Sequence, residues 1–261
     1  MKSYKAYAKV NIFLKITGKR GSYHEILSRF VLVNDLYDTL TFVPKEGDDF
    51  VIEGDFNCEI GQNTIYKAFK ALLEATHSES LKRLMQSHAV KVDKRIPSFA
   101  GLGGGSSDAA TYLLMCNEVL HLGLSRDELA AIGTKVGADV PFFVYGYQSA
   151  NVSGIGEIVN IFDEPMLKIR TVTPKLEIST PKVYNAFREH FYHALGEEEQ
   201  NRLAQMPSLE VLATYTALEA NDLFEPALML YPELKKHYKS GWFFSGSGSS
   251  FFTVLDLRAG R

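Results

Sequence analysis

Residues 97–110 constrain this chain more than any other part of its sequence. They read Pro-Ser-Phe-Ala-Gly-Leu-Gly-Gly-Gly-Ser-Ser-Asp-Ala-Ala, with four glycines directly before an apolar helical pattern. Glycine has no Cβ, so such a backbone adopts positive φ and lets a ligand approach its amides closely. A helix N-terminus leaves its first N–H groups unpaired and carries a partial positive charge. The run therefore predicts a site for a phosphate-bearing ligand, with a turn that only lets a helix pack closely as the alternative.

Two common phosphate-binding motifs do not fit this run. A Walker loop requires Gly-Lys-Ser or Gly-Lys-Thr, and neither tripeptide occurs in the chain. The dinucleotide fingerprint G-x-G-x-x-G fails because Ser106 stands where its last glycine belongs. Backbone amides and hydroxyls must therefore hold the phosphate without a motif lysine.

The composition is that of an ordinary folded protein with a sizeable core. The chain has 261 residues, of which 46% are hydrophobic and 23% charged, as in typical globular domains. Its formal net charge is −3 and its pI is about 6.2, which does not favour a nucleic-acid partner. We therefore expect a small-molecule partner and no nucleic acid, while the oligomeric state stays open.

The cysteines and the apolar runs indicate a cytoplasmic protein without a membrane segment. Cys58 and Cys116 are far apart and form no Cys-x-x-Cys pair, which argues against a disulfide framework or a structural zinc site. The first residues contain no apolar stretch of signal-peptide length. No apolar run is long enough to cross a bilayer.

Hydrophobic periodicity predicts an α+β fold. Residues 8–16 alternate between apolar and polar side chains, which predicts a strand with one buried face. Further strands are predicted at 30–33, 39–43, 50–53, 90–92, 169–173, 177–179, 242–245 and 251–255. Helices are predicted to begin at Asn63, Ser106 or Ser107, Ser125, Pro181, Glu197 and Ser208. We expect two lobes, an N-terminal domain over residues 1–155 and a C-terminal domain over residues 156–261.

Asp139 is the strongest candidate for a catalytic base. Phosphoryl transfer requires gripped phosphates, a metal that spreads charge, and a group that orients or deprotonates the attacking hydroxyl. Asp139 is a lone acid in an apolar turn between Gly137 and Pro141. Partial desolvation there can tune a carboxylate as a base or favour its pairing with a cation. The alternative is an aspartate that caps the following helix.

Lys9 and Asn11 share the polar face of the first predicted strand. A lysine on such a strand is either an edge residue that blocks aggregation or a site residue. Beside a phosphate loop and a candidate base, the site role gains weight. The Lys9 charge could keep Asp139 ionised and polarise a substrate hydroxyl.

Tyr23 and His24 follow the basic turn of residues 19–21, where they could stack on and hydrogen-bond a heterocycle. The alternative is an ordinary hairpin tip with a solvated histidine. Tyr184 and Asn63 have no special meaning without further context. The loop at 246–250 could approach a ligand or simply join two strands, and the second interpretation is favoured.

Four stretches of the chain together resemble one known superfamily. They are residues 8–14; residues 18–24 with 36–38; the glycine run with residues 137–143; and residues 245–249 after Asn221 and Asp222. The resemblance is to the galactokinase, homoserine kinase, mevalonate kinase and phosphomevalonate kinase superfamily, known as the GHMP kinases. It implies an ATP-binding N-terminal domain, a second domain, and an active site in the cleft between the lobes.

The resemblance assigns roles by position. Lys9 and Asp139 match the catalytic pair. The ATP phosphate loop matches Pro97, Ser98, Phe99, Ala100, Gly101, Leu102, Gly103, Gly104, Gly105, Ser106 and Ser107, and the adenine region matches Asn63 and Lys94. Tyr23, His24 and Tyr184 match positions that hold a cytidine ring, and Asn11 falls beside the substrate hydroxyls. Phe99 departs from the pattern, because a glycine is common at its position.

The Tyr-His turn narrows the resemblance to a branch whose alcohol substrate is a cytidyl diphosphate methylerythritol. The implied reaction is ATP- and Mg²⁺-dependent phosphorylation of its C2 hydroxyl, with no metal ligand assigned. A mevalonate- or homoserine-type kinase is a second hypothesis, although small alcohols need no aromatic clamp. A catalytically silent nucleotide-binding module is the third.

Overall fold

The computed structural model describes residues 2–21, 23–56 and 58–255. The chain forms two compact units, and we describe each by itself. The first unit comprises Met1–Ala8, Asp35–Ser98 and Gly103–Gly146, and the second comprises Lys9–Asn34, Phe99–Leu102 and Tyr147–Arg261. The expected linear division into residues 1–155 and 156–261 stays a prediction. None of the helices in the described ranges has the length and apolar character needed to cross a bilayer.

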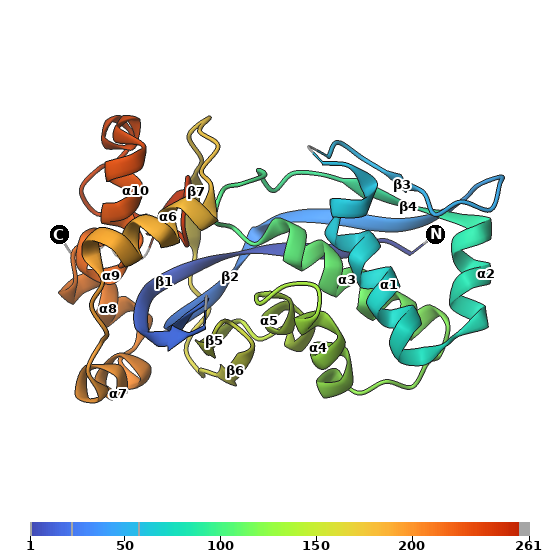
Figure 1. Ribbon diagram of the computed structural model, residues 1–261, viewed down its shortest axis with the longest axis horizontal. Helices are drawn as coiled ribbons and strands as arrows, with labels where there is room; N and C mark the ends of the chain where they lie inside the picture. Colours follow the sequence, from blue (N-terminus) through green and yellow to red (C-terminus); the bar gives the residue numbers. More distant parts are fainter. Residues whose placement is uncertain (1, 22, 57, 256–261) are drawn as a thin grey trace. The chain divides into compact units, whose positions relative to one another are not determined.

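Two long strands, β1 (Tyr4–Arg20) and β2 (Tyr23–Pro44), pair with each other and contribute residues to both units (Figure 1). The strand expected at residues 8–16 is confirmed, but the single buried face was wrong. Lys9, Asn11 and Lys15 are buried like their apolar neighbours. Burial of these polar side chains costs little stability because each has a polar partner. Lys15, for example, forms an ion pair with Asp222. The strands expected at 30–33 and 39–43 are parts of the one strand β2.

The first unit combines helices with short strands. Strand β4 (His88–Asp93) pairs with the end of β2 and with β3 (Ile52–Glu53). A 3₁₀ turn, Ile60–Gln62, leads to α1 (Thr64–Thr76), which is followed by α2 (Glu79–Ser87). The helices α1, α3 (Gly104–Val119), α4 (Arg126–Thr134) and α5 (Val140–Tyr145) pack against one another (Figure 1).

Helix caps confirm two of the expected starts and correct a third. The Asn63 side chain accepts a bond from the N–H of Ile65 and begins α1. Ser125 and Glu128 form the expected capping box of α4. The start expected at Ser106 or Ser107 was wrong, since α3 already begins at Gly104 behind a left-handed Gly103 at φ 72°. Glycine adopts this conformation without steric cost, which lets the helix start earlier.

The second unit carries two sets of strands. Strand β5 (Ser149–Gly154) pairs with the start of β2 and with β6 (Ile158–Ile161). A separate three-stranded sheet has the order β7 (Ile169–Val172), β9 (Phe251–Val254), β8 (Phe243–Phe244). The strand expected at 177–179 was wrong, because Ser179 instead precedes a helix and its N–H donates to the Tyr231 hydroxyl.

The helices of the second unit are short. They are α6 (Thr180–Ala186), α7 (Glu197–Gln205), α8 (Ser208–Thr214), α9 (Ala217–Ala220) and α10 (Phe224–Leu230), with a π-helical turn at Phe187–Phe191 and a 3₁₀ turn at Pro232–Lys236. The acidic helix expected from Glu197 is confirmed. The helix expected from Ser208 is confirmed as α8 and ends at Thr214, since Thr216 caps a new helix, α9.

Candidate functional site

The start of α3 leaves backbone N–H groups available to an anion. Gly103 supplies no side-chain cap, and the first helical bond runs from the Ser107 N–H to the Gly103 carbonyl. Thr64 donates from its hydroxyl to the Gly105 carbonyl over 2.6 Å, which ties this turn to α1. The N–H groups of the first helical turn therefore have the geometry that binds phosphate oxygens.

The turn that carries Asp139 lies beside the start of α3. A Cβ placed on Gly137 would lie 3.6 Å from the Ser106 hydroxyl oxygen, and α3 packs against α5. Asp139 is half-buried and stands directly before α5, yet its side chain makes no capping bond. The capping interpretation is therefore wrong. The structure brings a carboxylate to the same region of the first unit as the predicted phosphate-binding turn.

Lys94 lies in a buried ion cluster under this turn. Its ammonium contacts Asp38 and lies 2.7 Å from Asp108 Oδ2. The same ammonium lies 3.7 Å from the position that a Cβ on Gly104 would take. Asp38 also accepts the backbone N–H groups of Arg95 and Ile96. The cluster thus fixes the segment that leads into Pro97 and supports the first residue of α3. The adenine role expected of Lys94 stays a prediction.

The two carboxyl groups of the cluster differ in their hydrogen bonding. Asp38 accepts three N–H donors, whereas Asp108 Oδ1 is buried and has no hydrogen-bond partner among the described residues. Burial raises the pKa of Asp108 to about 7. The positive charge of Lys94 opposes this rise, but repulsion from Asp38 partly cancels the effect of Lys94. Asp108 is therefore the member of the cluster that takes up a proton near neutrality.

This proton makes the stability of the fold depend on pH. An aspartate in the unfolded chain ionises near pH 4, whereas the pKa of folded Asp108 is about 7. The stabilisation that Asp108 provides is fully present below about pH 4 and is lost as the pH rises through 7. Over this range the free energy of unfolding falls by up to about 1.4 kcal/mol per pH unit. We expect Asp108→Asn to remove this slope in urea unfolding at pH 5, 6, 7 and 8. The matched variant Asp93→Asn, at an exposed site, should keep it.

A second loop clamps the middle of the glycine run within the second unit. The N–H of Ser250 donates to the Ala100 carbonyl over 3.1 Å, and the Ser245 hydroxyl donates to the Gly101 carbonyl over 3.0 Å. Residues 245–250 are buried. The interpretation of this loop as a simple turn between strands was therefore incomplete. The loop also fixes the backbone of residues 99–102.

Lys9 and Asn11 form a buried polar pair in the second unit. The Lys9 ammonium donates to Asn11 Oδ1 over 2.7 Å and lies 4.4 Å from the centre of the Phe30 ring. Asn11 Nδ2 donates to the Ser28 hydroxyl over 2.9 Å. The N–H of Lys9 donates to the Leu102 carbonyl, which ties β1 to the glycine run. The edge-strand interpretation of Lys9 was wrong, since only 4% of this residue is exposed.

His24 and Tyr184 form an aromatic pair in the same unit. Their ring centres lie 5.4 Å apart at an interplanar angle of 30°, and Phe187 meets His24 edge-on. His24 is buried, and no described residue offers its Nε2 atom a hydrogen bond. Burial lowers the pKa of His24, with smaller contributions from Arg188 and Lys19, so the ring is neutral at pH 7. The solvated hairpin-tip interpretation was wrong for His24, while Tyr23 is exposed.

The expected site residues fall into separate groups. The first unit brings the start of α3 together with Asp139, Asn63 and Lys94. The second unit brings Lys9 and Asn11 together with residues 99–102, and His24 together with Tyr184. Lys9 and Asp139 belong to different units, so their pairing stays a prediction. The roles of all these residues toward ATP and substrate stay predictions too.

Asp38, Asp108, Ser28 and Asn221 also contribute to these groups, although the sequence predicted no role for them. Asn221 donates from its amide to the carbonyls of Phe244 and Gly246, which holds the 245–250 loop. Asp108 had one visible signal, namely an acidic residue inside the apolar first turns of a helix. The other three have partners far away in the sequence, which no local pattern reveals.

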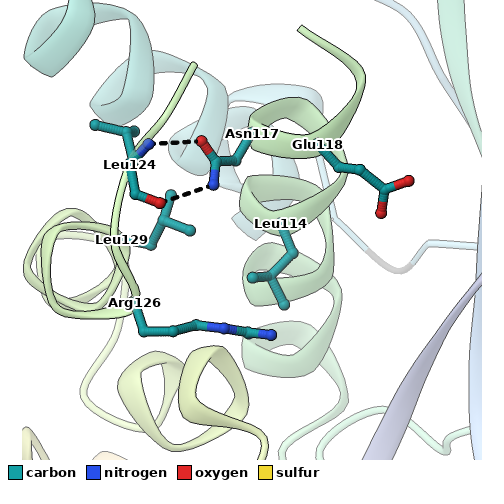
Figure 2. Close-up of a pocket in the computed structure, with 6 residues that line it drawn as sticks. All are labelled: Leu114, Asn117, Glu118, Leu124, Arg126 and Leu129. Atoms are coloured by element: carbon teal, nitrogen blue, oxygen red, sulfur yellow. Dashed lines mark hydrogen bonds between the residues drawn. The ribbon is translucent and has the colours of Figure 1, made fainter. Parts of the chain in front are cut away.

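A cavity of about 350 Å³ lies at the other end of α3 (Figure 2). Its lining consists of Leu114, Asn117, Glu118, Leu124, Arg126 and Leu129, none of which the sequence predicts in a site. Figure 2 shows the Asn117 amide bonded to the N–H and the carbonyl of Leu124. This amide closes the loop between α3 and α4, so its role is structural.

Comparisons with known proteins identify the family of this chain. Residues 63–147 match the family described as "GHMP kinases N terminal domain". The 4-diphosphocytidyl-2-C-methyl-D-erythritol kinase of Sulfurimonas denitrificans is 64% identical over 260 residues, covering 98% of each chain. That of Sulfurovum sp. is 49% identical and covers 98% of this chain and 100% of its own. The crystal structure of a 4-(cytidine 5'-diphospho)-2C-methyl-D-erythritol kinase is 32% identical, with a TM-score of 0.69 over 99% of this chain and 96% of its own.

Proposed function

Because this chain belongs to the 4-diphosphocytidyl-2-C-methyl-D-erythritol kinase family, we propose that it phosphorylates the alcohol in that family's name. The chain is an ATP-dependent phosphotransferase of the GHMP kinase fold. The proposed product is the 2-phosphate, formed at the C2 hydroxyl, together with ADP. The single observation that carries the substrate assignment is the stacked pair of His24 and Tyr184, with an unpartnered ring nitrogen on His24.

The aromatic pair suits a nucleobase. A neutral imidazole offers one donor and one acceptor, which complements the polar edge of a cytosine ring. Tyr184 provides an aromatic face of the kind that binds bases by stacking. Small alcohols such as mevalonate or homoserine have no group that requires such a pair, so this feature favours a cytidyl substrate.

The spacing along β2 suits a long substrate. Asn11 contacts Ser28, which lies four residues beyond His24 on the same face of β2. Four residues of extended strand span about 13 Å. A base held at His24 and an alcohol held at Asn11 would therefore need a linker between them. In the proposed substrate, the diphosphate is that linker.

The remaining roles follow from the chemistry of phosphoryl transfer. We assign the N–H groups at the start of α3 to the phosphates of ATP, and Asp139 to the acceptance of the C2 hydroxyl proton. Lys9 would hold the hydroxyl in register and stabilise developing negative charge. Phosphoryl transfer needs this positioning more than covalent chemistry from the protein.

Mg²⁺ is proposed as the metal that accompanies ATP. Among the described residues, no group of three or more His, Cys, Asp or Glu side chains is arranged to hold a metal ion. Mg²⁺ normally keeps several waters and binds through phosphates and one or two carboxylates. The Ser106 hydroxyl would supply one protein ligand beside the phosphates, and Asp139 keeps its proposed role as the base. When bound, the ion neutralises charge on the β- and γ-phosphates.

Removing the stacking ring should raise the KM for the cytidyl substrate. We expect Tyr184→Ala to increase this KM by roughly tenfold, because base–aromatic stacking contributes about 1–3 kcal/mol. The KM for ATP should not change. The matched variant Tyr184→Phe keeps the ring and should retain the parental KM. Steady-state kinetics with each substrate varied in turn measure both KM values in the parent and in the two variants. An unchanged KM for the cytidyl substrate in Tyr184→Ala would remove Tyr184 from the site.

The function itself is tested by ADP release. Purified protein with Mg·ATP and the cytidyl methylerythritol diphosphate should release ADP, whereas CMP in place of the alcohol should give none. Mevalonate and homoserine, offered in parallel, should be poor acceptors. ATP binding without ADP release on any alcohol would instead favour a non-catalytic nucleotide-binding protein.

Some expectations from the sequence remain part of this proposal. They are a cytoplasmic location, which rests on the cysteine usage, the absence of a nucleic-acid partner, and an active site between an ATP-binding domain over residues 1–155 and a second domain over residues 156–261.

A further inference from the structure

Ser28 is a small polar residue in the buried part of β2. Its side chain is fully buried, and most of its neighbours on the strand are buried apolar residues, among them Ile26, Leu27 and Phe30. A hydroxyl that leaves water must find hydrogen-bond partners or it lowers the stability of the fold. An alanine would pack at this position without that requirement. The reason for a serine therefore lies in the contacts of its hydroxyl.

Both hydrogen bonds of the Ser28 hydroxyl reach β1. The hydroxyl donates to the Phe13 carbonyl and accepts from Asn11 Nδ2 over 2.9 Å. A serine hydroxyl has one hydrogen, and the Phe13 carbonyl takes it. The Ser28 oxygen can therefore meet the Asn11 amide only as an acceptor. It binds the amide nitrogen and would repel the amide oxygen.

Lys9 fixes the other end of the same amide. An ammonium group only donates, so its partner must be the amide oxygen. The Lys9 ammonium donates to Asn11 Oδ1 over 2.7 Å. A flipped amide would place two donors together at Lys9 and two oxygens together at Ser28. Because Asn11 is buried, water does not replace these partners, and the amide is held in one orientation.

We propose that Ser28 is a positioning residue that orients the Asn11 amide and, through it, the Lys9 ammonium for phosphoryl transfer. This inference rests on the proposed function, in which Lys9 and Asn11 act on the substrate hydroxyl. The three residues belong to one unit, and their hydrogen bonds lie within it. Phosphoryl transfer depends on the placement of such groups more than on covalent chemistry. Ser28 itself is assigned no contact with either substrate.

Removing the hydroxyl should slow turnover more than it weakens binding. Ser28→Ala deprives the Asn11 amide nitrogen of its acceptor, and we expect kcat to fall about tenfold. The KM for ATP should stay within about twofold of the parent. The KM for the cytidyl alcohol should change less than kcat does, because the base remains at His24. Coupled ADP release with each substrate varied in turn measures these values.

Ser149 provides a matched control for the loss of a buried hydroxyl. It lies on β5, which pairs with β2, and its buried hydroxyl donates to Glu164 Oε1 over 2.6 Å. Ser149→Ala should lower the midpoint of urea unfolding, as Ser28→Ala does, but should keep the parental kcat. Equal losses of kcat in the two variants would overturn the inference, since a general loss of stability would then explain both.

A double-mutant cycle tests whether Ser28 acts through Asn11. If it does, the effect of Ser28→Ala on kcat should disappear once the Asn11 amide is gone. We expect Ser28→Ala to lower kcat about tenfold in the parent and less than about twofold in an Asn11→Ala background. A tenfold loss in both backgrounds would overturn the inference, because Ser28 would then act independently of Asn11.

A measurement without turnover separates this inference from the proposed function. The side-chain amide resonances of Asn11 in ¹⁵N-labelled protein, assigned by their absence in Asn11→Ala, report its hydrogen bonds. We expect Ser28→Ala to shift these resonances and Ser149→Ala to leave them in place. Unchanged resonances in Ser28→Ala would overturn the inference. Shifted resonances in a protein that releases no ADP on any alcohol would count against the proposed function and leave the orienting role of Ser28 intact.

Discussion

Replacing Asp139 by asparagine is expected to lower kcat by roughly 10²–10⁴-fold, the range over which a positioned general base contributes. Asparagine keeps the size of the side chain but cannot accept the hydroxyl proton. The Asp139 side chain does not cap α5, so loss of a helix cap cannot explain such an effect. Coupled ADP-release kinetics measure kcat, and ATP titration shows whether nucleotide binding survives.

The control for this variant is another aspartate of the first unit. Asp127 accepts a bond from the Tyr145 hydroxyl at the surface and has no predicted part in the reaction. Asp127→Asn should therefore keep the parental kcat. A kcat of Asp139→Asn within about threefold of the parent would show that another group takes the proton.

The second large effect is expected from Gly101→Ala. A Cβ on Gly101 would lie 2.1 Å from the Ser245 carbonyl oxygen and 3.1 Å from the Gly248 nitrogen. Both are backbone atoms, so the two loops would have to separate. We expect a loss of about 3 kcal/mol in the free energy of unfolding. The KM for ATP should rise at least tenfold, because the displaced segment includes Phe99 and Leu102. Urea unfolding and steady-state kinetics measure the two effects.

Gly123 provides the comparison that isolates the steric clash. Its φ of 73° equals that of Gly101, but nothing lies within 4 Å of its would-be Cβ. Gly123→Ala should therefore lower the free energy of unfolding by only about 1 kcal/mol, as expected for an alanine in the left-handed conformation. Equal losses in the two variants would mean that backbone conformation, rather than contact between the loops, determines the stability of the glycine run.

Local signals predicted those parts of the fold whose determinants are adjacent in sequence. Asn63 and Ser125 begin helices because each side chain bonds an N–H two or three residues ahead. The start of α3 was placed too late for a different reason. It depends on the left-handed Gly103 and on the close approach of Gly104 to Ile96, which only the packed structure reveals.

The polar residues of the site show the same limit. Lys9 and Asn11 could be singled out because they interrupt an apolar strand. Their burial could not be predicted, since Asn11 depends on Ser28, which lies 17 residues away. Lys94 was placed near ATP by resemblance, but its ion pairs join it to Asp108 and Asp38 over 14 and 56 residues. Long-range pairing of this kind leaves no periodic pattern in the sequence.

The division of the chain between the two units has a consequence for its synthesis on the ribosome. The chain passes from one unit to the other after residues 8, 34, 98, 102 and 146. Residues 9–34 therefore leave the ribosome long before β5 and Asn221, their neighbours in the second unit, whereas the first unit is complete by residue 146. At about 5–20 residues per second this delay lasts several seconds. Throughout it, β1 lacks its partners from the last third of the chain, such as the Asp222 N–H that donates to the Leu14 carbonyl. The first strand to be made therefore reaches its final hydrogen bonding only after most of the chain has been synthesised.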